Sequence, residues 1–104
     1  MIALSPQHEA QAARLMSRLM SGQRNAISGP DLAASIGVSK SVLPLYIRWL
    51  RQEGMPIASE HQGGYWLADR AEELESTVDQ LRRKRRGIDE MLAILARTQE
   101  LLPA

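Results

Sequence analysis

The chain has 104 residues, of which 44% are apolar and 24% charged; this allows one compact domain with an appendage and excludes two independent cores. Thirteen Lys and Arg against twelve Asp and Glu leave a formal charge of +1, so net charge alone indicates no partner. Without Cys, disulfides, thiolate zinc sites and Cys nucleophiles are excluded. We expect a cytoplasmic protein, because no apolar stretch is long enough to span a membrane and the start lacks a secretory signal.

Three helices are predicted in the first half of the chain. Ser5-Pro6 indicates the start of a helix over 6–20, because Ser caps helices and Pro fits their first turn. The side of this helix predicted to be buried carries Leu15, Met16, Leu19 and Met20. Residues 23–27 predict a brief extended segment. Ser28 then begins a second helix, with Asp31 placed to complete its cap, and Gly37 ends it.

The third helix is predicted over 39–53, with Ser39 as its cap. Its predicted core side carries Val42, Leu43, Tyr46, Ile47 and Leu50, and its outward side carries Ser41, Leu45, Arg48 and Gln52. Pro44 conflicts with a helix interior. Either Ser41 is the true cap, which places Pro44 in the first turn, or the helix is kinked.

A β-hairpin is predicted next, with strands over 57–60 and 65–68 joined by the Gly-bearing turn 61–64. Because side chains alternate along a strand, Tyr65 and Leu67 share one face and Trp66 lies on the other.

Beyond Asp69 the apolar residues follow a heptad repeat. Leucine or isoleucine recurs every seventh residue at Leu74, Leu81, Ile88, Leu95 and Leu102, and the companion positions are Ala71, Val78, Arg85, Leu92 and Gln99. One continuous helix over 69–102 is the favoured interpretation, with a length of roughly 50 Å at 1.5 Å per residue. Gly87 leaves a bent helix or a helical hairpin open.

The order of these elements predicts a mainly α fold with a small β-hairpin: a winged helix-turn-helix domain (1–68) followed by a C-terminal dimerisation helix (69–104) resembling a coiled coil. The segments 28–33, 36–40, 50–54 and 64–67 resemble the N-terminal winged-helix domain of biotin repressor proteins. The resemblance covers about residues 10–68 and implies DNA binding, with the third helix in the major groove and the wing beside it. The biotin ligase part of those proteins has no counterpart here, so no ligase activity is implied.

Candidate DNA contacts follow from this arrangement. Arg48 and Gln52 are the predicted base readers, because a guanidinium pairs with guanine and an amide with adenine. The full set of candidates is Ser28, Ser39, Lys40, Ser41, Leu45, Arg48, Gln52, His61 and Gln62. Each also has a structural interpretation: the serines cap helices, and Arg48 and Gln52 belong to a solvated face. The basic run 82–86 is flanked by acidic residues, so ion pairs within or between helices are favoured over nucleic-acid contact.

The leading hypothesis is a homodimeric regulator that binds double-stranded DNA through two half-sites, in a format that fits a phage or prophage regulator. Dimerisation is assigned to the heptad residues Leu74, Val78, Leu81, Ile88, Leu92, Leu95 and Leu102. The alternative is an adaptor that binds another protein through the Leu45 and Trp49 surface or through the heptad helix. We predict no enzyme, no metal site and no cofactor, because no catalytic or phosphate-binding motif is present and the two histidines are far apart in the sequence.

Overall fold

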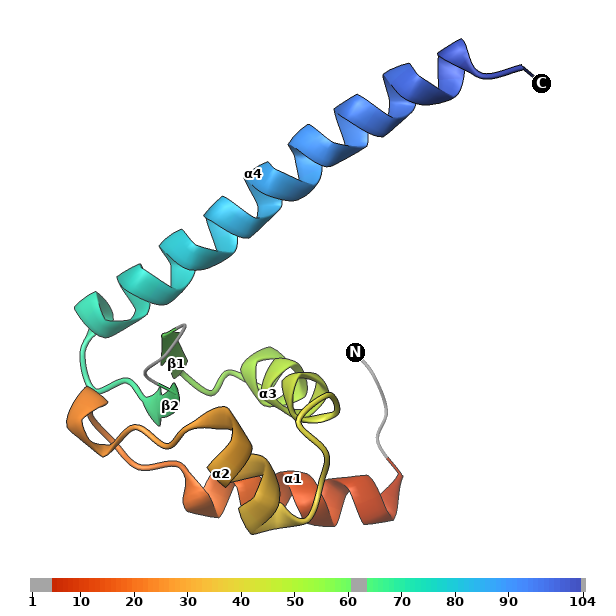
Figure 1. The fold of residues 1–104 in the computed structure, drawn as a ribbon. Helices are drawn as coiled ribbons and strands as arrows, with labels where there is room; N and C mark the ends of the chain where they lie inside the picture. Colours follow the sequence, from red (N-terminus) through yellow and green to blue (C-terminus); the bar gives the residue numbers. More distant parts are fainter. Residues whose placement is uncertain (1–4, 61–63, 104) are drawn as a thin grey trace.

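The structure is a computed structural model that describes residues 5–60 and 64–103. Its elements in chain order are α1 (Pro6–Arg18), the 3-10 turn η1 (Gln23–Asn25), α2 (Gly29–Ile36), α3 (Leu43–Gln52), β1 (Ile57–Glu60), β2 (Gly64–Leu67) and α4 (Ala71–Leu101). Three helices and the hairpin form a compact body, and α4 crosses above the hairpin and projects beyond it (Figure 1). The predicted fold class, mainly α with a hairpin and a long C-terminal helix, is confirmed.

Helix α1 begins where the sequence predicts. The Ser5 hydroxyl accepts a hydrogen bond from the His8 amide, and Pro6 lies in the first turn. The helix ends at Arg18, since Leu19 has extended backbone angles. The prediction that Met16 and Met20 are buried is wrong, because both are about half exposed. The buried side is centred on Ala12, Leu15 and Leu19, and the methionines lie beyond its edge.

The segment after α1 differs from the extended strand predicted over 23–27. Residues Gln23–Asn25 form the 3-10 turn η1, and the strand-like contacts lie on either side of it. Gly22 donates to the Leu67 carbonyl at 3.0 Å, and Ile27 exchanges two backbone hydrogen bonds with Tyr65 at 2.9 and 2.8 Å. Gly22 has φ +88°, a conformation that few other residues adopt without strain. It turns the chain so that both flanks of η1 meet β2.

The predicted cap of α2 is confirmed for Ser28, because its hydroxyl accepts a hydrogen bond from the Asp31 amide at 3.2 Å. Gly37 ends it in the left-handed conformation at φ +75°. Helix α3 begins at Leu43, so the prediction of Ser39 as its cap is wrong, and so is the alternative of Ser41. The cap residue is Val42, without a side-chain hydrogen bond. A helix from Ser39 would place Pro44 in its interior, where the ring clashes with a carbonyl. The later start puts Pro44 in the first turn.

The core is formed by the inward sides of α1, α2 and α3, and one face of the hairpin covers it. From α3 it takes Leu43, Tyr46, Ile47 and Leu50, with Val42 partly buried. The strands pair antiparallel, with Ile57 opposite Leu67 and Ala58 opposite Trp66. Tyr65 and Leu67 share one face, as predicted, and this face packs against the helical core, whereas Trp66 lies outside that cluster and is 2% exposed.

Helix α4 is continuous over 31 residues, including Gly87, which confirms one helix rather than a bent helix or a helical hairpin. Leu102 follows its last turn. The helix packs along β1, where Thr77 is buried. The Thr77 hydroxyl accepts from the Ser59 amide at 3.0 Å and donates to the Ser59 carbonyl at 3.2 Å. A single side chain therefore satisfies both backbone groups of one residue on the outer edge of the hairpin.

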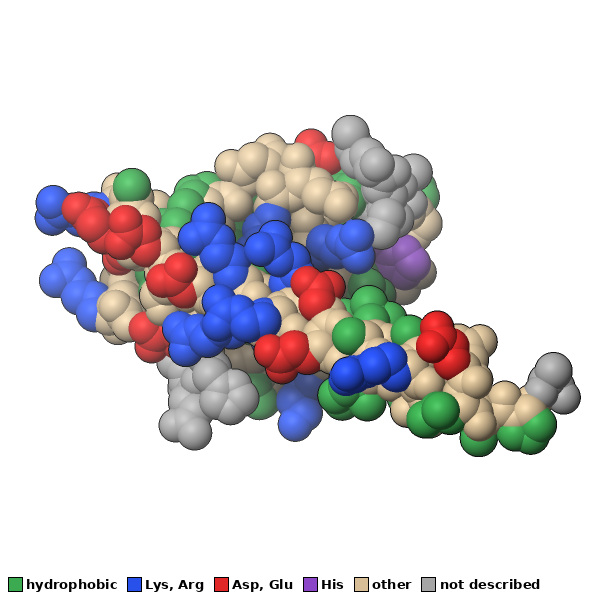
Figure 2. All heavy atoms as spheres, turned by 90° about the horizontal axis from the view of Figure 1, so that it is seen from above, with side chains coloured by type: hydrophobic (Ala, Val, Ile, Leu, Met, Phe, Trp, Pro, Cys, Tyr) green, Lys and Arg blue, Asp and Glu red, His purple; other side chains and the backbone are tan. Residues whose placement is uncertain are grey.

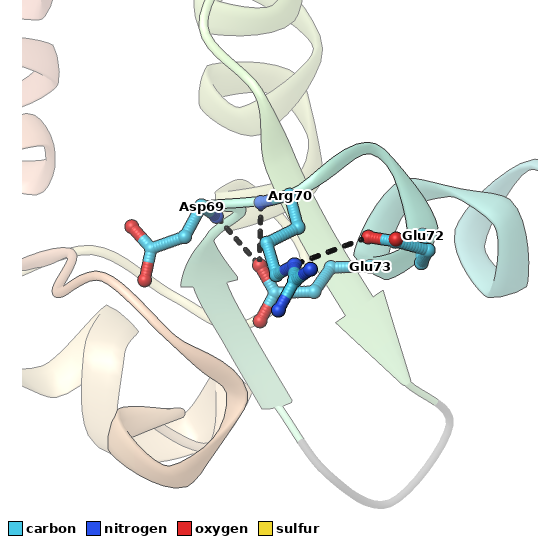
Figure 3. A network of polar contacts seen from close by, with 4 residues as sticks. All are labelled: Asp69, Arg70, Glu72 and Glu73. Atoms are coloured by element: carbon cyan, nitrogen blue, oxygen red, sulfur yellow. Dashed lines mark hydrogen bonds and ion pairs between the residues drawn. The ribbon is translucent and has the colours of Figure 1, made fainter.

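The first turn of α4 is held by Glu73. Its carboxylate accepts from the backbone amides of Asp69 at 2.5 Å and Arg70 at 3.3 Å, and the Arg70 guanidinium lies 3.5 Å from Glu72 (Figure 3). These bonds favour the ionised carboxylate. The hydrogen bond from the Asp69 amide is the main cause that lowers the pKa of Glu73, and desolvation opposes it.

This lowered pKa predicts a pH-dependent contribution to stability. A carboxylate whose pKa is lower in the folded state stabilises the fold above its unfolded pKa, and the contribution is lost as the pH falls through the folded pKa. Glu73→Gln is expected to reduce the free energy of unfolding at neutral pH. As the pH falls, the free energy of unfolding of the variant should approach that of the parent. Urea unfolding of both proteins over a pH series measures this difference. A difference that stays constant with pH would contradict it. Glu75→Gln, an exposed change five residues after the N-cap Arg70, is the control.

Candidate nucleic-acid interface

One side of α3 is free of the core. Leu45, Arg48 and Gln52 are all exposed there, and Leu45 is 59% exposed. Their spacing of three and four residues places them within about 60° of the helix circumference, opposite the buried side. An aliphatic, a guanidinium and an amide side chain thus follow one another along roughly 10 Å of helix. The structure brings together the two predicted base readers and the neighbouring leucine.

The turn before α3 carries Ser39, Lys40 and Ser41, all of them exposed. The hydroxyls of Ser39 and Ser41 lie 3.0 Å apart. These residues were expected at the amino end of the helix, where the helix dipole attracts phosphate. They precede that end, because the Ser39 carbonyl accepts from the Val42 and Leu43 amides in a turn. The turn presents two hydroxyls and an ammonium group, without the helix N-terminus itself.

The two arginines of α3 have different environments. Within residues 5–60 and 64–103, no carboxylate lies within 4.0 Å of Arg48. Arg51 instead donates from Nε and Nη2 to the Ile57 carbonyl at 3.0 and 2.9 Å, and from Nη2 to the Ser59 hydroxyl at 3.3 Å. Burial lowers the pKa of Arg51. Arg51 therefore joins α3 to β1, whereas Arg48 is exposed.

The wing is held beside the start of α2 by a close backbone approach. Gly64 has φ +79°, and a Cβ atom there would lie 2.1 Å from the Ile27 carbonyl oxygen. Ser28 follows at once and is exposed. The acidic Glu60 accepts from Gln23 Nε2 at 2.9 Å. The predicted contacts His61 and Gln62 lie outside the described residues.

The basic run 82–86 lies in the middle of α4, and all five side chains are exposed. Figure 2 shows Lys and Arg side chains gathered over this part of the helix, with acidic side chains on either side. In the described part of the chain, Arg82 is the member of this run within 4.0 Å of a carboxylate, at 3.7 Å from Asp79. Neutralisation by the flanking acids therefore applies to Arg82 and leaves the other four cations without such a contact.

Two of these cations lie near the start of α2. Arg83 and Lys84 line a hollow of about 560 Å³ together with Ser28, Gly29 and Tyr65. The sequence could not reveal this proximity, because Ser28 and the run are far apart in the chain and meet through the packing of α4 on β1. Arg83 and Lys84 are thus additional candidates for contact with the phosphate backbone.

In residues 5–60 and 64–103, no group of three or more His, Asp or Glu side chains is arranged to hold a metal ion. Over the same ranges, none of the helices combines the length and the apolar character needed to cross a membrane.

Comparison with known proteins connects this geometry to a family. Residues 12–65 match the family model described as "HTH domain", which spans the fold from α1 to the second strand of the wing. The match covers slightly more than half of the chain. No curated protein and no solved structure matches it.

Proposed function

The chain belongs to the HTH domain family, and from this premise we propose that it is a small sequence-specific transcriptional regulator that binds double-stranded DNA as a homodimer. The helix-turn-helix assignment supports DNA binding. The observation that carries the proposal is the outward side of α3, which presents Arg48 without a carboxylate contact while the opposite side of the helix is buried. Such a helix fits the major groove, which is wide enough to admit it.

In this proposal each exposed residue has a defined role. Arg48 donates to guanine, Gln52 pairs with adenine, and Leu45 contacts a thymine methyl group. Lys40 and the hydroxyls of its neighbouring serines contact phosphate oxygens, which position the protein without reading sequence. Ser28 at the start of α2 is assigned the same task, and His61 with Gln62 at the wing tip is assigned to the minor groove.

The homodimer is proposed from the second half of α4. Ile88 and Leu92 are each 61% exposed and Leu95 is 57% exposed, although their heptad spacing is that of an interface between helices. A second copy that covers them would join two α3 helices in one particle. Two linked domains bind two half-sites more tightly than either domain alone, which favours an operator with inverted half-sites.

Replacement of Arg48 by Ala tests the DNA contact. We expect Arg48→Ala to weaken binding to the selected operator by about 1–3 kcal/mol, which is about 5- to 150-fold, because it removes a base contact. Selection from a random duplex library supplies the operator, and fluorescence anisotropy at several salt concentrations measures the affinity. Arg14→Ala, which removes an exposed arginine on α1, should retain the parent affinity. Equal affinity of the two variants, or failure of the library to enrich any site, would contradict the proposal.

A second candidate is supported by the exposure of Leu45, which adds an apolar surface to α3 beside the partly buried Trp49. Such a surface also fits a protein partner. Salt separates the two functions, because DNA binding weakens steeply with salt and an apolar protein contact does not. Binding that is insensitive both to salt and to Arg48→Ala would favour the adaptor.

A further inference from the structure

The exposed residues on the apolar side of α4 indicate the direction in which two copies of this helix would pair. It carries Val78, Leu81, Ile88, Leu92 and Leu95, all at least 40% exposed. On the basis of the homodimer proposed above, we propose that two copies of α4 pair antiparallel over their full length, with Leu81 of one copy opposite Leu92 of the partner subunit. The occupant of the surface is thus a second copy of this chain.

Arg85 is the first argument for this direction. In a parallel pair each core position faces its own copy, so two Arg85 guanidinium groups would meet at the centre of the interface. In an antiparallel pair the positions of Arg85 and Ile88 face each other instead. The proposed register places Arg85 opposite Ile88 of the partner subunit, where the guanidinium can extend past an aliphatic side chain to the edge.

Charge complementarity selects the register. With full overlap, Arg82 lies beside Asp89 of the partner subunit, and the twofold symmetry repeats the contact. A shift by one heptad in one direction brings Asp89 against its own copy, and a shift in the other direction brings Arg82 against its own copy. Both shifts replace two attractions with repulsion between like charges. In the monomer Arg82 is exposed and also lies 3.7 Å from Asp79.

A second row of apolar residues points to the same direction. Thr77 and Gln80 are on the side of α4 that meets the hairpin and the adjoining hollow. Met91 and Ile94 occupy the same heptad positions two repeats later, yet they are 52% and 46% exposed. In the antiparallel pair they lie level with the partner's hairpin and can pack beside it. In a parallel pair they would be in water, remote from both domains.

The antiparallel pair also places the two proposed DNA-binding domains where both could contact one DNA duplex. Both lie on the same side of the paired helices, whereas a parallel twofold pair would place them on opposite sides. The two copies of Thr77 are separated by roughly 28 Å along the helix axis, from a rise of 1.5 Å per residue. Successive turns of a DNA duplex are about 34 Å apart, so this separation fits half-sites in adjacent major-groove turns.

Disulfide trapping tests the direction, and the chain has no native Cys that would interfere. A disulfide needs Cα atoms within about 7 Å. We expect mild oxidation to link most of the Leu81→Cys/Leu92→Cys double variant into covalent dimers. A mixture of the two single variants should also link. Each single variant alone should give less than about a tenth of that yield, because its two cysteines lie roughly 16 Å apart along the axis.

The outcomes separate the inference from the homodimer itself. Sedimentation of the reduced full-length chain as a monomer at micromolar concentration would overturn both. A dimer in which each single variant links to itself would be parallel, and would overturn the direction only. A second double variant, Val78→Cys/Leu95→Cys, probes the same register. A dimer in which neither double variant links would overturn the register.

Discussion

A single acidic substitution on α4, Leu92→Glu, is expected to convert the protein to a monomer and to weaken binding to an operator with two half-sites by about 100-fold or more. Leu92 is 61% exposed in the single chain, so the change leaves the monomer fold intact. In the proposed dimer it would bury a carboxylate against leucine, which is strongly unfavourable. Loss of the second linked domain removes a gain in affinity of about 10²- to 10⁴-fold.

Sedimentation velocity at micromolar concentration and anisotropy with the two-half-site duplex measure these effects. Ala93→Glu is the matched control, because it adds the same charge one residue later, about 100° around the helix and away from the heptad side. It should remain a dimer with the parent affinity. If Leu92→Glu also remains a dimer, the heptad residues do not form the interface.

The largest loss of stability is expected for Gly64→Ala. The added Cβ would lie 2.1 Å from the Ile27 carbonyl oxygen and 2.5 Å from its carbon, and the residue has φ +79°. Both contacts are with backbone atoms, which cannot rotate away. A left-handed conformation costs an L-residue about 1–2 kcal/mol, and relief of the overlap would displace the wing from α2. We expect a total loss of about 2–4 kcal/mol in the free energy of unfolding.

Urea or thermal unfolding measures this loss, with Gly87→Ala as the control. Gly87 lies within α4, and a Cβ atom there would have no neighbour within 4 Å outside the adjacent backbone of its own helix. That change should stabilise the protein by about 0.5–1 kcal/mol, because Ala is the better helix former. Equal effects of the two substitutions would show that the contact between Gly64 and Ile27 does not constrain the wing.

The elements that the sequence predicted well are those set by local signals. Ser5 and Ser28 cap their helices by hydrogen bonds to amides three residues later, and Gly37 ends α2 in the conformation that glycine tolerates best. The hairpin follows from alternation across Trp66 and from the glycines of its turn. In each case the determining residues lie within a few positions of the feature.

The errors have two physical sources. Met16 fits the helical period but lies past the edge of the surface that α1 buries. Periodicity predicts which side of a helix faces the core, but it does not predict how wide the buried surface is. Ser39 has the chemistry of a cap, but Pro44 delays the helix and moves its start to Leu43.

The remaining features depend on tertiary contacts. The bonds of Thr77 to Ser59, and the placement of Arg83 near Ser28, join residues far apart in the chain, so no local pattern marks them. The outward position of Arg48 was predicted from the helical period, whereas the separate role of Arg51 became evident from its hydrogen bonds to β1. Binding by the predicted contact residues stays a prediction.

Because α4 is attached to the hairpin near Thr77, a small rotation there moves the far end of the helix by a much larger distance. From Thr77 to the last turn of α4 is roughly 36 Å at 1.5 Å per residue. A rotation of about 10° at the hairpin would therefore move the far tip by roughly 6 Å. Since α4 meets the body through β1, where the Thr77 hydroxyl bonds both backbone groups of Ser59, the angle between α4 and the body depends on contacts near one end of the helix. In the proposed dimer, substitutions around Thr77 would therefore change the spacing between the two bodies and the operator length that they accept.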